Sequence, residues 1–190
     1  MSVKNIMIVG VGGQGTLLAS KLLGHLLLNM GYDVKVSEVH GMSQRGGSVV
    51  TYVRYGDRVY SPVIDKGEAD FVVSFEQLEA ARWLEYLKPG GTVITNTQQT
   101  DPMPVITGVM EYPEALIEKM RSLGVRVDAV DALRLSEEAG SSRAVNLVLM
   151  GKLSTYFDFP DDVWQEAVTA CVPPKFLELN RKAFALGKNA

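Results

Sequence analysis

The chain has 190 residues, 46% of them apolar, which is enough to close the core of one ordinary domain, and we predict a single domain over residues 1–190. Its 19 basic and 22 acidic residues leave a net charge of −3, which gives no field that attracts nucleic acid or an anionic membrane. Cys171 is the single cysteine, which excludes an internal disulfide and a Cys-ligated iron–sulfur cluster, because such a cluster takes about four thiolates.

The N-terminal residues run directly into an apolar strand and lack a basic region, a longer apolar stretch and a small-residue cleavage site. No later apolar run reaches the about 18 residues that a membrane helix requires. We therefore expect a cytoplasmic protein that binds neither a membrane nor nucleic acid.

The first elements form a strand, glycine turn, helix, strand unit. Asn5–Gly10 is a short run of Ile, Met and Val, typical of a strand buried on both faces of a parallel sheet. Thr16–Met30 predicts a helix, almost all Leu and Ala, that ends at Gly31. Asp33–Val39 predicts the second strand, and the polar residues 40–47 that follow predict an irregular loop.

The next segment predicts an antiparallel hairpin. Ser48–Tyr55 and Arg58–Val63 are β-rich runs, and Gly56-Asp57 between them suits a two-residue turn. Beyond it, strands and helices alternate, as in a doubly wound α/β sheet. The predicted elements in chain order are the strand Ala69–Phe75, the helix Glu76–Leu87, the strand Thr92–Asn96, the helix Pro113–Leu123 and the strand Val125–Val130.

The last part of the chain is helical by pattern. We predict helices at Ala144–Phe157, Asp161–Cys171 and Lys175–Leu186, with prolines at their boundaries because proline fits a helix start better than its interior. The sequence therefore predicts an α/β fold: a Rossmann-like, doubly wound sheet, mostly parallel with an antiparallel hairpin, and a C-terminal helical cap.

The glycine turn is the first candidate site. Gly10, Gly12 and Gly15 fit G-x-G-x-x-G between a strand and a helix, where backbone N–H groups can face a diphosphate. In a dinucleotide site an acid near the end of the second strand, here Glu38, would bind the ribose. The alternative is that the glycines only allow close packing of helix on strand. Gly13-Gln14 and the glycine-rich loop after Glu38 favour a phosphate site over a nicotinamide site.

The loop after the second strand is the next candidate. His40, Ser43, Gln44 and Arg45 lie between glycines, at the carboxyl end of a strand, where open α/β sheets bind ligands. Arg45 suits a phosphate or carboxylate and His40 a hydrogen bond. Docking of this loop on a partner is the alternative, because loops carry both kinds of contact.

Three further residues are candidates for the same crevice. Glu76 follows a predicted strand directly, and Arg143 and Asn146 stand at the start of the first C-terminal helix, where helix capping is the alternative interpretation. No Ser/His/Asp or Cys/His arrangement is present, and Cys171 suits a buried apolar position. We assign no catalytic residue and no metal ligand.

Several segments together carry a resemblance over almost the whole chain. They resemble the gamma-type subunit or domain of the 2-oxoacid:ferredoxin oxidoreductase family, and most of all its arylpyruvate branch. The segments are GVGGQGTLLASKLL (10–23), SEVHGMSQRGGSVVTYVRYG (37–56), SPVIDKGEADFVVSFEQLEAAR (61–82), YLKPGGTVITN (86–96) and NRKAFALG (180–187).

The resemblance implies a hetero-oligomeric complex that oxidatively decarboxylates a 2-oxoacid such as indolepyruvate. The acyl group goes to coenzyme A and the electrons go to ferredoxin. Thiamine diphosphate, Mg and 4Fe-4S clusters belong to a large partner subunit, which the single cysteine and the lack of a glycine-aspartate-glycine diphosphate motif here match. This chain would contribute to the coenzyme A site and to assembly, and would be inactive alone.

Three alternatives stay open at this point. The chain could serve a complex for another 2-oxoacid, namely pyruvate, 2-oxoglutarate or a branched-chain acid. It could be a stand-alone NAD-dependent oxidoreductase in which Glu38 binds the ribose, or a purely structural subunit that binds no nucleotide.

Overall fold

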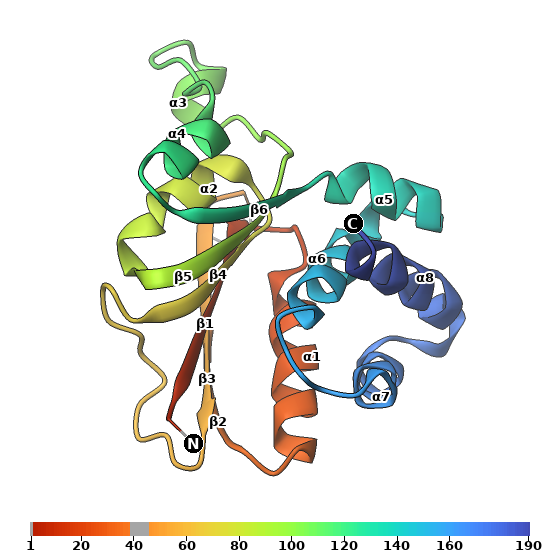
Figure 1. Cartoon of the computed structure of the whole chain (residues 1–190). Helices are drawn as coiled ribbons and strands as arrows, with labels where there is room; N and C mark the ends of the chain where they lie inside the picture. The colour runs from red at the N-terminus through yellow and green to blue at the C-terminus, as the bar shows by residue number, and fades with distance from the viewer. Residues whose placement is uncertain (1, 39–45) are drawn as a thin grey trace.

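The structure is a computed structural model, and it describes residues 2–38 and 46–190. In these residues the strands form one six-stranded sheet with the order β2-β3-β1-β4-β5-β6 (Figure 1). The strands are β1 (Lys4–Val11), β2 (Asp33–Glu38), β3 (Ser48–Gly56), β4 (Ala69–Ser74), β5 (Leu87–Asn96) and β6 (Arg126–Val130).

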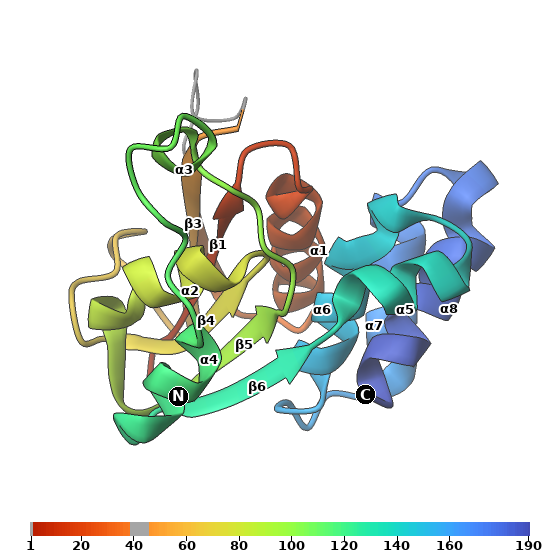
Figure 2. The same ribbon diagram turned by 90° about the horizontal axis from the view of Figure 1, so that it is seen from above.

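Helices cover both faces of this sheet, as Figure 2 shows from above. The helices are α1 (Thr16–Asn29), α2 (Gln77–Arg82), α3 (Met103–Ile106), α4 (Leu116–Ser122), α5 (Ala132–Ala139), α6 (Val145–Ser154), α7 (Asp161–Cys171) and α8 (Leu177–Lys188). Short 3-10 turns lie at η2 (Leu84–Tyr86), η3 (Ser142–Ala144) and η4 (Pro174–Phe176). The doubly wound α/β fold with a C-terminal helical cap is confirmed.

The central strands are buried on both faces, as predicted. In β1, Ile6 and Ile8 face the core shared with α1, α5, α6, α7 and α8, whereas Met7 and Val9 face the core shared with α2 and α4. All four side chains are fully buried. Because successive side chains of a strand point to opposite faces, one apolar run serves two cores.

The predicted antiparallel strand is confirmed, but the prediction that it pairs with Arg58–Val63 is wrong. β3 pairs antiparallel with β1 on one side and with β2 on the other, so both of its edges are used. Arg58–Val63 therefore has no free edge of β3 to join, and it forms no strand. That segment is held by side chains instead, since Arg54 donates to the carbonyl oxygen of Val63 and Val59 N donates to Asp33 Oδ2 at 2.7 Å.

Several helix boundaries also differ from the prediction. The helix expected at Glu76–Leu87 ends at Arg82, and Leu87 already belongs to β5, where it pairs with Ala69 of β4. The helix α5 was not predicted, although Asp131 provides a side-chain cap by accepting a hydrogen bond from Arg134 N at 3.1 Å. α3 was not predicted either. The pairing of Leu87 with β4 and the side-chain cap at Asp131 therefore determine where β5 and α5 begin.

The helical cap depends on a close crossing of α6 and α8. A Cβ at Gly187 would overlap the backbone carbonyl oxygen of Val148, and one at Gly151 would overlap that of Phe184. Only glycine allows two helix backbones to approach this closely, because any side chain would meet backbone that cannot move aside. The crossing fixes the start of α6 relative to the sheet.

We expect Gly187→Ala to lower the free energy of unfolding by about 3 kcal/mol, because the added methyl group must push α8 away from α6. Gly24→Ala, inside α1, is the matched control: its Cβ would lie 3.8 Å from Val36 Cγ2, an ordinary contact. That variant should be stabilised by about 0.5–1 kcal/mol, since alanine is the better helix former. Urea unfolding of both variants measures the difference, and equal effects would contradict the close crossing.

Candidate functional site

The glycine turn joins β1 to α1 at the carboxyl end of the sheet. Gly13 and Gly15 have φ angles of 101° and 92°, a left-handed conformation that favours glycine. Gln14 closes the turn, because its Oε1 accepts a hydrogen bond from Val11 N at 2.8 Å. Within residues 2–38 and 46–190, the amides of Gly13 and Gly15 donate to no backbone carbonyl oxygen.

Gly10 and Gly12, which also belong to the motif, make contacts within the protein. A Cβ at Gly10 would lie 2.8 Å from Gln14 Oε1 and 2.9 Å from Phe75 Cβ. Gly12 N donates to the carbonyl oxygen of Gly47 at 2.8 Å, and the carbonyl oxygen of Gly12 accepts from Gly46 N at 3.2 Å. For Gly10, the alternative that glycine permits close packing fits the structure.

Asn146 connects the helical cap to the turn. Its Nδ2 donates to the carbonyl oxygen of Gly15 at 3.4 Å, and its Oδ1 accepts from Leu147 N at 2.9 Å. A Cβ at Gly15 would lie 2.9 Å from Asn146 Nδ2, so the two elements touch directly. Asn146 is thereby buried behind the turn and holds the start of α6 against it.

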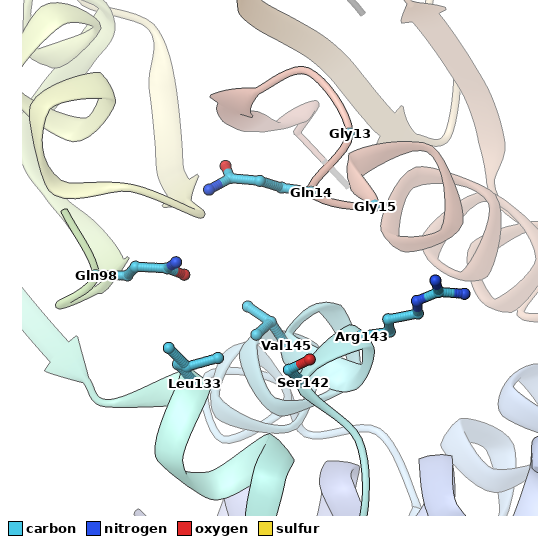
Figure 3. A pocket seen from close by; sticks show the side chains of 8 residues that line it. All are labelled: Gly13, Gln14, Gly15, Gln98, Leu133, Ser142, Arg143 and Val145. Atoms are coloured by element: carbon cyan, nitrogen blue, oxygen red, sulfur yellow. The ribbon is translucent and has the colours of Figure 1, made fainter. Parts of the chain in front are cut away.

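A cavity of about 650 Å³ lies between the turn and the cap (Figure 3). Arg143 is its single charged lining side chain among the described residues, and Gln98 and Ser142 add polar groups. Its lining residues are Gly13, Gln14, Gly15, Gln98, Leu133, Ser142, Arg143 and Val145. A guanidinium, backbone amides and neutral polar groups around one cavity suit an anionic ligand with further hydrogen-bonding groups.

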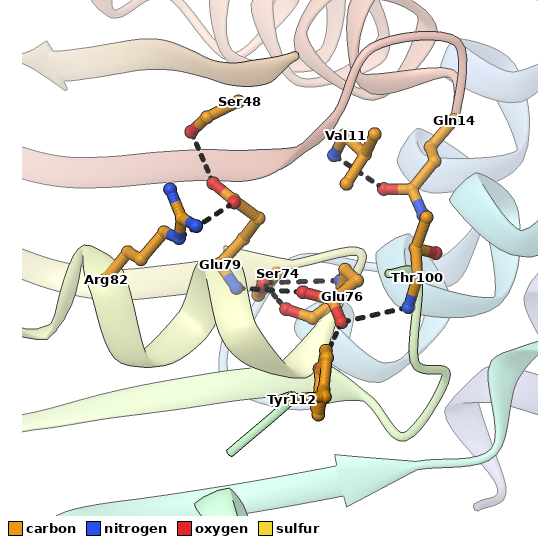
Figure 4. A network of polar contacts seen from close by, with 9 residues as sticks. All are labelled: Val11, Gln14, Ser48, Ser74, Glu76, Glu79, Arg82, Thr100 and Tyr112. Carbon is orange, nitrogen blue, oxygen red and sulfur yellow. Dashed lines mark hydrogen bonds and ion pairs between the residues drawn. The ribbon is translucent and has the colours of Figure 1, made fainter. Parts of the chain in front are cut away.

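A second polar site lies on the other side of the turn, in a cavity of about 270 Å³ (Figure 4). Glu76 caps α2 by accepting a hydrogen bond from Glu79 N at 2.9 Å. The same carboxylate accepts from Thr100 N at 3.2 Å and from the hydroxyl group of Tyr112. These donors satisfy a carboxylate that is only 1% exposed.

Glu79 is the second buried carboxylate of this site, with an exposed fraction of 4%. Ser48 Oγ donates to Glu79 Oε2, and Arg82 Nε lies 3.4 Å from Glu79 Oε1. Burial raises the pKa of Glu79, while Ser48 and Arg82 act in the opposite direction. Glu79 therefore holds a proton more readily than an exposed glutamate does.

The structure brings only part of the predicted site together. Gly13, Gln14, Gly15 and Arg143 line the first cavity and Asn146 supports it, whereas Glu76 belongs to the second cavity. His40, Ser43, Gln44 and Arg45 lie outside the described residues.

Glu38 lies in a third depression, between α1 and β2, away from the cavity at the glycine turn. Its Oε1 accepts a hydrogen bond from Ser20 Oγ at 2.6 Å. Because β3 lies between β1 and β2, the end of β2 is not beside the end of β1, as a ribose-binding acid requires.

Sequence reasoning missed Gln98, Leu133, Ser142 and Val145 of the first cavity and Glu79 and Thr100 of the second. It also missed Tyr112, which donates to Glu76. The available signal for Gln98 was its place two residues after β5, at the carboxyl end of a parallel strand. Leu133 gave no such signal, because it lies on the unpredicted helix α5.

Within residues 2–38 and 46–190, no group of three or more His, Cys, Asp and Glu side chains is arranged to hold a metal ion. Nor does that part of the chain contain a helix long and apolar enough to cross a membrane. Cys171 is buried at the end of α7, as predicted, and burial raises the pKa of its thiol.

The chain belongs to the pyruvate ferredoxin/flavodoxin oxidoreductase family, whose pattern it matches over residues 5–190. It is 45% identical to the indolepyruvate oxidoreductase subunit IorB of Thermococcus kodakarensis, over 98% of this chain and 95% of that protein. Identity to the 2-oxoglutarate synthase subunit KorC of Methanothermobacter thermautotrophicus is 28%, over 97% of this chain and 93% of that one.

Two solved structures share the fold. Pyruvate oxidoreductase subunit PORC of Thermotoga maritima aligns with a TM-score of 0.76 at 19% identity, covering 100% of this chain and 97% of its own. The 2-oxoglutarate:ferredoxin oxidoreductase of Magnetococcus marinus, with 2-oxoglutarate, coenzyme A and succinyl-CoA bound, aligns with a TM-score of 0.74 at 21% identity. That alignment covers 100% of this chain but only 31% of the longer one.

We expect the buried Glu79 to make stability depend on pH. Since its pKa is higher in the folded state than its ordinary value of 4.5, the folded state gains from the proton at low pH and loses that gain as pH rises through the folded-state pKa. The free energy of unfolding of the wild type, relative to Glu79→Gln, should therefore fall between about pH 4.5 and about pH 7.5.

Urea unfolding at the two pH values measures this difference. Glu178→Gln, which changes an exposed carboxylate on α8, is the control and should keep the pH dependence of the wild type. If Glu79→Gln also kept it, the proton would not reside on Glu79.

Proposed function

We propose that this chain is the small, IorB-type subunit of an indolepyruvate:ferredoxin oxidoreductase. The complex would oxidatively decarboxylate aryl 2-oxoacids to aryl-acetyl-CoA and pass the electrons to ferredoxin. The observation that carries this proposal is the 45% identity to an IorB subunit along nearly the full length of both chains. The lower identity of 28% to a 2-oxoglutarate subunit favours the aryl branch over another 2-oxoacid.

Within this complex, the chain would bind part of coenzyme A in the cavity between the turn and the cap. The amides of Gly13 and Gly15 and the guanidinium of Arg143 suit the phosphate groups of that cosubstrate. Gln98 and Ser142 suit its amide and hydroxyl groups. The volume of about 650 Å³ lies within the usual range for small-molecule sites.

Thiamine diphosphate, Mg and the 4Fe-4S clusters fit the partner rather than this chain. One cysteine cannot ligate a cluster that takes about four thiolates, and no acidic or histidine group of the described residues forms a metal site. We therefore place these groups in a large partner subunit, with ferredoxin reached through the complex. Location in the cytoplasm remains a prediction.

The family membership leaves the stand-alone NAD-dependent enzyme without support. The separation of Glu38 from the cavity at the glycine turn agrees with this, because a ribose-binding acid belongs to the same site as the diphosphate. A purely structural subunit remains the alternative that the experiments below distinguish.

The test of the proposed function is co-expression of the tagged chain with the large subunit encoded in the same genome, followed by purification without oxygen. We expect the large subunit to be recovered with the chain, and the complex to reduce a viologen dye only when indolepyruvate and coenzyme A are both present. A chain that is recovered alone, or a complex that acts on 2-oxoglutarate or pyruvate but not on indolepyruvate, would contradict the proposal.

The coenzyme A site is tested by Arg143→Gln in the same complex. Losing one charge-assisted hydrogen bond should raise the KM for coenzyme A about tenfold and leave kcat nearly unchanged. Arg58→Gln, at an exposed arginine that lies against Tyr60 outside the cavity, is the matched control. If the two variants gave the same KM, Arg143 would not contact coenzyme A, and a purely structural subunit would be favoured.

A further inference from the structure

Residues 97–112, here called the apolar arm, project from the end of the sheet and carry α3 near their tip (Figures 1 and 2). Four large apolar side chains on the arm are exposed to solvent: Met103 by 66%, Ile106 by 65%, Val109 by 78% and Met110 by 63%. Single exposed apolar residues are ordinary, but a gathered group marks an interaction site.

The tip of the arm has a defined shape. Val109 N and Met110 N both donate to the carbonyl oxygen of Pro104, at 2.9 and 3.0 Å, and this folds the chain back over α3. Thr107 adds a hydrogen bond from Oγ1 to the carbonyl oxygen of Met103 at 2.9 Å. The exposed apolar side chains are therefore presented on ordered backbone.

Both stems of the arm are held by one buried group. Glu76 accepts a hydrogen bond from Thr100 N, on the stem that enters the arm, and from the hydroxyl group of Tyr112, on the stem that leaves it. A segment that is already ordered loses less conformational entropy when it binds. The arm is thus prepared to bind without first having to fold.

The charge of the arm is entirely acidic. Asp101 lies on the arm and Glu111 and Glu114 lie at its end, all three exposed, while residues 89–118 contain no lysine and no arginine. A surface with an apolar centre and an acidic rim is complementary to an apolar socket with a basic rim. A second copy of this chain is a poor occupant, because its own arm would bring like charges together in a protein of net charge −3.

The length of one structural relative indicates what lies next to this fold. In the 2-oxoglutarate:ferredoxin oxidoreductase of Magnetococcus marinus, the part that matches this chain is only 31% of the polypeptide. A unit of this fold is there covalently joined to a much larger remainder. The IorB subunit of Thermococcus kodakarensis, in contrast, is matched by this chain over 95% of its length. A subunit of that kind needs a non-covalent surface to make the same connection.

We propose that the apolar arm is the anchor by which this chain docks onto the large thiamine- and iron–sulfur-containing subunit, with Met103, Ile106, Val109 and Met110 entering an apolar socket whose rim is basic. The proposal rests on the proposed function for the identity of the partner. It adds the surface and its chemistry.

The experiment compares three tagged chains, each co-expressed with the large subunit and purified without oxygen: wild type, Val109→Asp and Leu123→Asp. Leu123 is the matched control, since it is 75% exposed but lies at the end of α4, outside the arm. The ratio of large subunit to tagged chain is measured, together with the circular dichroism of each chain. Val109→Asp should weaken association at least about tenfold, because an unpaired carboxylate would enter the socket.

Each outcome has a separate meaning. Recovery with the wild type and Leu123→Asp but not with Val109→Asp, all three chains being folded, supports the arm as the anchor. Equal recovery of the large subunit with all three chains contradicts the proposal that the arm is the anchor, while the proposed function stands. No recovery with the wild type contradicts the proposed function and removes the named partner. A Val109→Asp variant that binds the large subunit normally but changes a dimer of the isolated chain into a monomer would make a second copy the occupant, and would overturn the proposal.

The basic rim is tested separately by Glu111→Lys. Reversing a rim charge should slow association severalfold and reduce its dependence on salt, because the acidic arm no longer attracts the basic rim as strongly. Glu178→Lys on α8, which makes the same charge change at another exposed carboxylate, should associate like the wild type. If the two variants associated at equal rates at low and at high salt, the rim of the socket would not be basic.

Discussion

β3 pairs with β1 on one side and with β2 on the other, and the arrangement of the whole site depends on this pairing. It moves the end of β2 away from the glycine turn, so that Glu38 bonds to Ser20 instead of facing the turn. It also places Ser48, the first residue of β3, against the buried carboxylate of Glu79. The unit of β1, glycine turn and α1 resembles the start of a dinucleotide-binding fold. Because the antiparallel strand β3 separates β2 from β1, the acid at the end of β2 does not join the site at the turn.

The helical cap completes that site from the other side. Gly151 and Gly187 let α6 and α8 cross with their backbones in contact, and this holds the start of α6 where Asn146 reaches the carbonyl oxygen of Gly15. Arg143 comes to the cavity for the same reason. The chemistry of the cavity thus comes from the glycine turn, from Gln98 and from the start of the helical cap. The packing of the sheet and the apolar helices brings these distant parts of the chain together.

Glu76 links the interior to the surface that we propose for docking. Burying a carboxylate is costly unless its oxygens are satisfied, and here Glu79 N, Thr100 N and the Tyr112 hydroxyl group satisfy them. The same bonds order both stems of the apolar arm. Met103 and Pro104 of the arm also line the cavity that contains Glu79. Docking of the arm would therefore take place directly beside the second polar site.

The sequence by itself determined the α/β class, the buried central strands, the glycine turn and the three C-terminal helices, because hydrophobic period, glycine and proline act locally. Five sequence segments also indicated the protein family. Only the tertiary structure decided that Arg58–Val63 forms no strand and that Glu38 is separated from the turn. It also decided that Thr100 and Tyr112 both donate to the carboxylate of Glu76. Those features depend on which edge of β3 is free and on contacts between residues distant in the chain. A local sequence pattern cannot predict these features, because the packing of the whole fold determines strand order and side-chain partners.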